Sequence, residues 1–133
     1  MTIVLMDTVG LIALWEESDQ WHAGAEKAMT ALNALQARLV TTSAILLECG
    51  NAASRKPYRT EVDLLRRKLK ADGRLIVPTE SDIDLAWTDY RRGTAGDAGI
   101  VDHVSFTVMR RLGITDAFTN DRHFRAAGFN TLF

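Results

Sequence analysis

Short apolar runs alternate along the chain with longer segments whose apolar residues recur at helical spacing. The apolar runs predict five strands: Thr2–Met6, Leu39–Thr41, Leu75–Val77, Ala117–Thr119 and Asn130–Phe133. The helical spacing predicts seven helices: Val9–Glu16, Trp21–Ala37, Ser43–Ser54, Arg59–Ala71, Ser81–Arg91, Ile100–Leu112 and Arg122–Ala126.

The order of these elements predicts the fold. Strands that alternate with helices are joined by crossover connections and form a parallel sheet. Continuously apolar strands are typical of a sheet that is covered on both faces. We therefore expect the α/β class, as a three-layer α/β/α sandwich with a central parallel sheet. Because no repeat or linker-like stretch divides the 133 residues, we expect a single domain over residues 1–133.

Composition excludes several classes of protein. The chain is 47% hydrophobic and 25% charged, as in ordinary globular proteins. No run of 18 uncharged apolar residues is present, and no basic segment precedes the first apolar run, so we expect neither a membrane span nor a signal peptide. Cys49 is the only cysteine, which excludes an intrachain disulfide and suits a reducing, cytoplasmic location. The net charge of −1 argues against nucleic-acid binding by bulk charge but leaves a local basic patch open.

Asp7 stands where the first predicted strand meets the first predicted helix. One interpretation is a helix N-cap, since Asp is a favoured capping residue. The other is a functional site, because ligands of open parallel sheets bind at the carboxyl ends of the strands. Asp7 alone leaves both interpretations open.

Three further acids stand in unusual places. Glu48 lies in "TSAILLECGNAAS", a helical segment with almost no polar stripe, so we expect it to be partly buried. Asp102 lies in the first turn of "AGIVDHVSFTVMRRLG", and Asp121 directly follows a strand. The alternatives are an ion pair or a solvent-facing side chain for Glu48, a favourable helix-dipole position for Asp102, and an N-cap for Asp121.

Together these acids predict a metal site. Strand ends and the first turns of the adjoining helices gather at one edge of a parallel sheet, so the four carboxylates should converge there. Converging carboxylates repel one another and have raised pKa values. Mg²⁺ or Mn²⁺ would relieve this repulsion, since both ions prefer carboxylate oxygens, and such ions activate water for attack at phosphorus.

The sequence resembles the PIN-domain ribonucleases, in particular the small VapC toxins of bacterial toxin–antitoxin pairs. The resemblance covers nearly the whole chain and rests on "MDTVGLIAL", "TTSAILLECGN" and "DAGIVDHVSFTVMRRLGITDAFTNDRHFRAAGF". It implies hydrolysis of RNA phosphodiesters, a cognate antitoxin and a homodimer. By position it implies catalytic metal ligands at Asp7, Glu48, Asp102 and Asp121, and polar supports at Thr8 and Thr119. Asp97 lies in a glycine-rich stretch, where it is either an acid near the site or a plain helix cap.

Basic residues near these acids are candidates for contact with RNA. Arg91 and Arg92 precede the third acid, and Arg122 and His123 follow the fourth, although each could also belong to a solvated helix face. The leading hypothesis is a metal-dependent endoribonuclease that acts as a toxin. The alternatives are a PIN-domain nuclease used in RNA processing and a catalytically silent nucleic-acid-binding module.

Overall fold

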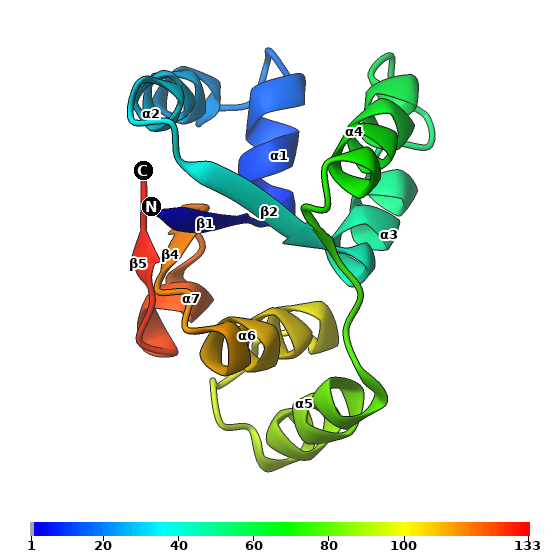
Figure 1. Ribbon diagram of the computed structural model, residues 1–133, viewed down its shortest axis with the longest axis vertical. Helices are drawn as coiled ribbons and strands as arrows, with labels where there is room; N and C mark the ends of the chain where they lie inside the picture. Colours follow the sequence, from blue (N-terminus) through cyan, green and yellow to red (C-terminus); the bar gives the residue numbers. More distant parts are fainter. Residues whose placement is uncertain (1) are drawn as a thin grey trace.

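The central element is a five-stranded parallel sheet, seen in a computed structural model that describes residues 2–133 (Figure 1). Its strand order is β3-β2-β1-β4-β5. The bounds are β1 Ile3–Met6, β2 Arg38–Thr42, β3 Leu75–Ile76, β4 Asp116–Phe118 and β5 Asn130–Thr131. Every strand pair is parallel, so the predicted parallel sheet is confirmed.

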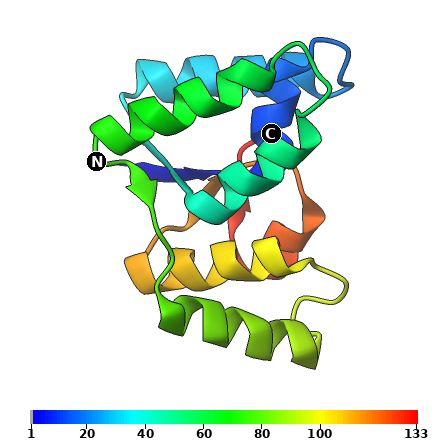
Figure 2. The ribbon, with the colours of Figure 1, turned by 90° about the vertical axis from the view of Figure 1, so that its right-hand side faces the viewer.

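Helices cover both faces of this sheet, which confirms the predicted three-layer sandwich (Figures 1 and 2). The helices α1–α4 lie on one side, and α5–α7 lie on the other. Their bounds are α1 Thr8–Trp15, α2 His22–Ala34, α3 Ser43–Ala52, α4 Arg59–Ala71, α5 Glu80–Arg92, α6 Ile100–Leu112 and α7 Arg122–Ala126. The largest deviation from the predicted helices is at the end of α2, which stops three residues before Ala37 because Gln36 has a positive φ of 54°.

Local signals in the sequence explain where several helices begin and end. The Thr42 hydroxyl accepts the Ile45 N–H at the start of α3, and Thr79 and Asp82 form a capping box at the start of α5. Gly113 ends α6 in the left-handed conformation that glycine adopts without strain. Arg111 of α6 pairs with Asp82 through two hydrogen bonds of 2.9 and 2.7 Å, which fastens α6 to α5.

The strand order places the topological switch point between β1 and β4. From β1 the chain continues outward to β2 and β3, and it then crosses back to place β4 on the opposite side of β1. Met6 is in register with Phe118, so the residues that follow these strands emerge side by side. In open α/β sheets, ligands bind outside the carboxyl ends of the strands at such a point.

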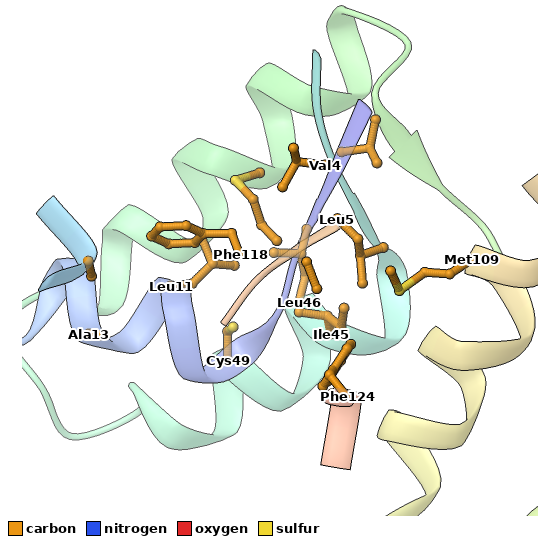
Figure 3. Packing of buried hydrophobic residues seen from close by; sticks show 14 of the residues in the cluster. Val4, Leu5, Leu11, Ala13, Ile45, Leu46, Cys49, Met109, Phe118 and Phe124 are labelled. Carbon is orange, nitrogen blue, oxygen red and sulfur yellow. The ribbon is translucent and has the colours of Figure 1, made fainter. Parts of the chain in front are cut away.

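Buried apolar side chains from the sheet and the adjoining helices hold this edge in place. Val4 and Leu5 of β1, Ile45 of α3 and Phe118 of β4 are fully buried, and they lie together in the core (Figure 3). Close packing of this kind fixes the strand ends because the side chains interdigitate with few voids. The residues at the end of β1 and β4 are therefore held on rigid backbone.

Substitution of Gly10 tests this packing. A Cβ atom at Gly10 would collide with the Phe118 carbonyl at the end of β4, whereas a Cβ at Gly50 of α3 would meet nothing within 4 Å. We expect Gly10→Ala to lower the free energy of unfolding by about 1–3 kcal/mol, as overpacked sites do. Gly50→Ala should raise it by about 0.5–1 kcal/mol, since alanine is the better helix former. Urea denaturation of both variants checks this, and an unchanged Gly10→Ala midpoint would contradict it.

Candidate metal centre

Asp7 follows β1 at the switch point and is 1% exposed. Its N–H donates to the Phe118 carbonyl at 3.3 Å, and its Oδ2 accepts from the Thr119 hydroxyl at 2.9 Å. Asp7 stands at the N-cap position of α1, but in the described structure its side chain makes no capping hydrogen bond. The capping interpretation of Asp7 is therefore wrong, and its carboxylate faces Thr119 and the other acids.

Thr119 connects two of the acids. Its hydroxyl donates to Asp7 and at the same time accepts the N–H of Asp121 at 3.1 Å. One buried hydroxyl therefore sets the position of the Asp7 side chain and of the backbone that carries Asp121. This geometry agrees with the supporting role expected for Thr119.

Glu48 reaches the same edge from α3. Its Oε1 accepts a hydrogen bond from the hydroxyl of Thr8, the first residue of α1. Glu48 is partly buried, as the apolar neighbours in its sequence predict. The contact joins α1 to α3 beside Asp7, and the supporting role of Thr8 in a metal site stays a prediction.

Asp102, Asp121 and His123 form the tightest cluster of the site. One ligand atom from each lies within 4.8 Å of the others. Asp102 stands in the first turn of α6, where the helix dipole favours an anion. Asp121 is the N-cap of α7 and accepts the His123 N–H at 2.9 Å, so its expected capping role is confirmed alongside its place in the cluster.

Neighbouring acids raise the pKa of two members of this set, Asp7 and Asp102. Burial and the nearby charge of Asp102 raise the pKa of Asp7 to about 7, against 3.8 for an ordinary Asp. Burial and the charges of Asp121 and Glu48 raise the pKa of Asp102 to about 6. Burial and repulsion thus act on Asp7 and Asp102, while Asp102 and Asp121 lie with His123 in one cluster; a shared metal site for all four acids stays a prediction.

Asp97 pairs with the residues that follow Asp121. Its Oδ1 is 2.6 Å from His123 Nε2, and its Oδ2 is 3.5 Å from Arg122 Nη2. The hydrogen bond to Asp97 raises the pKa of His123, and the same bond lowers the pKa of Asp97. Gly99, not Asp97, is the N-cap of α6. Of the two open interpretations of Asp97, the acid near the site is therefore the correct one.

The basic candidates occupy two positions in the fold. Arg91 and Arg92 are exposed in the last turn of α5, which leads through residues 93–99 to the start of α6. Arg122 is exposed beside Asp97, and it lines a hollow of about 370 Å³ together with His123 and Gly96. Sequence reasoning missed that His123 belongs to the acidic cluster. The sequence signal for this membership was the position of His123, two residues after Asp121 at the start of a helix.

The donor set fits a hard divalent cation. Asp7, Glu48, Asp102 and Asp121 offer carboxylate oxygens, the ligands that Mg²⁺ and Mn²⁺ prefer. Within the described residues, Asp7 forms no ion pair with a cationic side chain, so only hydrogen bonds, such as the one from Thr119, stabilise its charge when it ionises. A bound cation would stabilise the ionised forms of Asp7 and Asp102 together.

Comparisons with known proteins agree with this geometry. The PIN domain family model matches residues 4–130, and the chain belongs to this family. Two solved structures share its fold. The VapC20 toxin of Mycobacterium tuberculosis, described as cleaving the sarcin–ricin loop, is 24% identical over 97% of each chain, with a TM-score of 0.78. FitAcB of Neisseria gonorrhoeae is 14% identical over 98% of this chain and 96% of the other, with a TM-score of 0.65. The comparison with curated protein sequences gives no match.

The family and the site together support a hydrolase of the nuclease type. The search for membrane spans, made over the described residues, finds no helix with the length and apolar character to cross a bilayer.

The raised pKa of Asp7 predicts how stability depends on pH. In the metal-free fold Asp7 holds its proton up to about pH 7, whereas in the unfolded chain it ionises near 3.8. The folded state therefore binds more protons between these values, and stability falls as pH rises through this window. Asp7→Asn keeps an acceptor for Thr119 and removes the charge. We expect this variant to exceed the wild type at pH 8 by the order of a few kcal/mol, with a smaller difference at pH 5.

Thermal and urea unfolding in EDTA at pH 5 and pH 8 measures this difference. The matched control is Asp84→Asn on α5, an exposed carboxylate that should change stability little at either pH. A difference between wild type and Asp7→Asn that does not grow with pH would contradict the argument.

Proposed function

We propose that this protein is a metal-dependent endoribonuclease that hydrolyses RNA phosphodiesters and acts as the toxin of a toxin–antitoxin pair. The observation that carries the proposal is the convergence of Asp7, Glu48, Asp102 and Asp121 at the switch point of the sheet. The family match and the fold shared with VapC20 support a nuclease. We infer RNA as the substrate and the cytoplasm as the place where the protein acts.

The residues of the proposed site have two roles: some would hold the metal ion, and others orient those ligands. When bound, Mg²⁺ or Mn²⁺ activates water and stabilises charge at the scissile phosphate. Asp7, Glu48, Asp102 and Asp121 would hold the ion, while Thr119 and Thr8 orient Asp7 and Glu48. Rigid strand ends keep these carboxylates in place, so little reorganisation is needed when the ion and substrate arrive.

Basic side chains at the rim of the site would contact the RNA backbone. Arg122 stands beside the acids with its guanidinium exposed, and Arg91 and Arg92 lie at the end of α5. Cationic groups in such positions bind flanking phosphates and are needed here because the protein as a whole carries a charge of −1.

Two other functions remain as alternatives. A PIN-domain nuclease in RNA processing would share the same chemistry and differ in its target and partners. A silent nucleic-acid-binding module is disfavoured, because all four acids are present and their carboxylates influence one another's pKa.

Metal dependence is the first test. Purified protein should cleave RNA with Mg²⁺ or Mn²⁺ and lose this activity in excess EDTA. Glu48→Gln and Asp102→Asn should each lower the cleavage rate by about a hundredfold or more, because each removes a charged ligand from the site. Glu61→Gln, which changes an exposed carboxylate in the first turn of α4, is the matched control and should cleave as the wild type does. Full activity in EDTA would overturn the metal mechanism.

The toxin role predicts a protein inhibitor. An arginine of an antitoxin pairs well with carboxylates and would compete with the metal for Asp7, Glu48, Asp102 and Asp121. An apolar pocket of about 210 Å³ lies between α1, α2 and α4, and Leu11, Leu14, Trp15 and Leu65 are among its lining residues. This pocket would take apolar side chains of the same antitoxin segment.

Co-expression with the product of the small gene next to this one tests the role. That product should bind this protein, restore growth and abolish RNA cleavage. Replacing the arginine of the product that pairs with the four acids by alanine should restore cleavage. Binding without any effect on cleavage would contradict the blocking arrangement. Harmless expression of this protein on its own, with no partner found, would favour RNA processing.

A homodimer is part of the proposal. Exposed apolar side chains on several elements support it, among them Leu47 of α3 and Trp87 and Tyr90 of α5. Trp15 stacks on Tyr58, while Trp21 and Trp87 are about half exposed, so of the three tryptophans these two remain available to an interface. Light scattering at micromolar concentration should give twice the 14.8 kDa mass of the chain, and a monomer would refute the dimer.

A further inference from the structure

We propose that His123 is a nitrogen ligand of the bound metal ion and that Asp97 positions its ring, so that the centre prefers Mn²⁺ to Mg²⁺. This inference rests on the proposed function, because it concerns the same metal centre. It adds one ligand and one positioning residue to the four acids that the sequence predicts.

The first argument is the distance between the three groups. His123 Nδ1 lies 2.8 Å from Asp121 Oδ1 and 3.9 Å from Asp102 Oδ2. Bonds from a small divalent ion to its ligands are about 2.1 Å long, so two atoms bound to one ion are at most about 4.2 Å apart. Both distances are below this limit. The third pair, Asp102 and Asp121, lies within 4.8 Å, so a modest approach of these two carboxylates would let one ion contact all three groups.

The second argument is the orientation of the ring. Nδ1 faces Asp121 and Asp102, while Nε2 on the opposite side meets Asp97 Oδ1 at 2.6 Å. A metal-bound histidine almost always donates its second N–H to a carboxylate, a backbone carbonyl or water, which fixes the ring and makes the free nitrogen a better ligand. Asp97 already holds Nε2 in this arrangement.

In the metal-free protein both ring nitrogens lie within hydrogen-bond distance of carboxylate oxygens, Nδ1 of Asp121 Oδ1 and Nε2 of Asp97 Oδ1. A metal ion would bind Nδ1 through its lone pair, so a proton on this nitrogen would have to leave to solvent. The proton on Nε2 would stay on the ring and be donated to Asp97.

A nitrogen ligand affects which metal ion the site binds more tightly. Mg²⁺ takes carboxylate, carbonyl and water oxygens, whereas imidazole is a ligand for transition-metal ions. A site with four carboxylates and one imidazole should therefore bind Mn²⁺ more tightly than Mg²⁺. Substitution of His123 should reduce this preference.

Electron spin echo envelope modulation of bound Mn²⁺ tests the proposal without an activity assay. The wild-type protein should show a coupling to ¹⁴N that changes when the histidines are labelled with ¹⁵N. The coupling should vanish in His123→Gln and persist in His22→Gln, the matched control, because His22 on α2 contacts Ala13 and Glu26 instead. Where His123→Gln does not fold, a coupling that persists in both His22→Gln and His103→Gln is assigned to His123, since the chain has three histidines.

Binding affinities test Asp97. Asp97→Asn should keep the ¹⁴N coupling and weaken Mn²⁺ binding about tenfold in calorimetry, as loss of a positioning carboxylate does. His123→Gln should weaken Mn²⁺ binding by more than it weakens Mg²⁺ binding, and equal changes would contradict the selectivity argument.

The outcomes separate this inference from the proposed function. Tight Mn²⁺ binding without ¹⁴N coupling would overturn the role of His123 and leave an all-carboxylate nuclease. Absence of Mn²⁺ and Mg²⁺ binding in the wild type would overturn both.

Discussion

Repulsion between carboxylates at the carboxyl edge of the sheet is the constraint on which this site depends. Asp7 is buried beside Asp102 and Asp121, and the hydrogen bond from Thr119 only partly offsets the cost of its burial. The packed core has to hold these groups together against that repulsion. Such strain is tolerated where it serves function, because the surrounding structure determines the position of each group.

The topology provides the rigidity that this constraint requires. Since β1 and β4 are neighbours in register, Asp7 and Thr119 leave the sheet side by side. Gly10 allows α1 to approach the end of β4 so closely that no larger residue fits there. The Arg111–Asp82 pair fastens α5 to α6, the helix that carries Asp102. Each of these contacts lies outside the acidic cluster and acts by limiting how far its members can separate.

Much of this arrangement could be read from the sequence. Apolar runs located the strands, and four acids placed after strands or early in helices indicated one edge of the sheet. The contacts of Asp97 and His123 could not be predicted in this way, because they join residues 26 positions apart through the conformation of an irregular loop. Periodicity and capping rules describe neighbours along the chain, and they carry no information on such a pairing. The same limit left the role of Asp7 open until its side chain could be seen to face Thr119 and not the first turn of α1.

Some acids of the site lie beside positively charged side chains and others do not. This difference would affect how the site binds a cation. On one side His123 and Arg122 stand beside Asp121 and Asp97, so these acids have positive partners without metal. On the other side Asp7, with a pKa of about 7 and no cationic partner among the described residues, is only partly ionised at neutral pH. The pKa of Asp102, about 6, is also raised, but less than that of Asp7. Metal ligands must be deprotonated, so an arriving ion has to displace the protons that these groups still hold. Binding of the proposed metal ion would therefore release protons at this centre, and the affinity for the ion would rise with pH through the range in which Asp102 and Asp7 ionise.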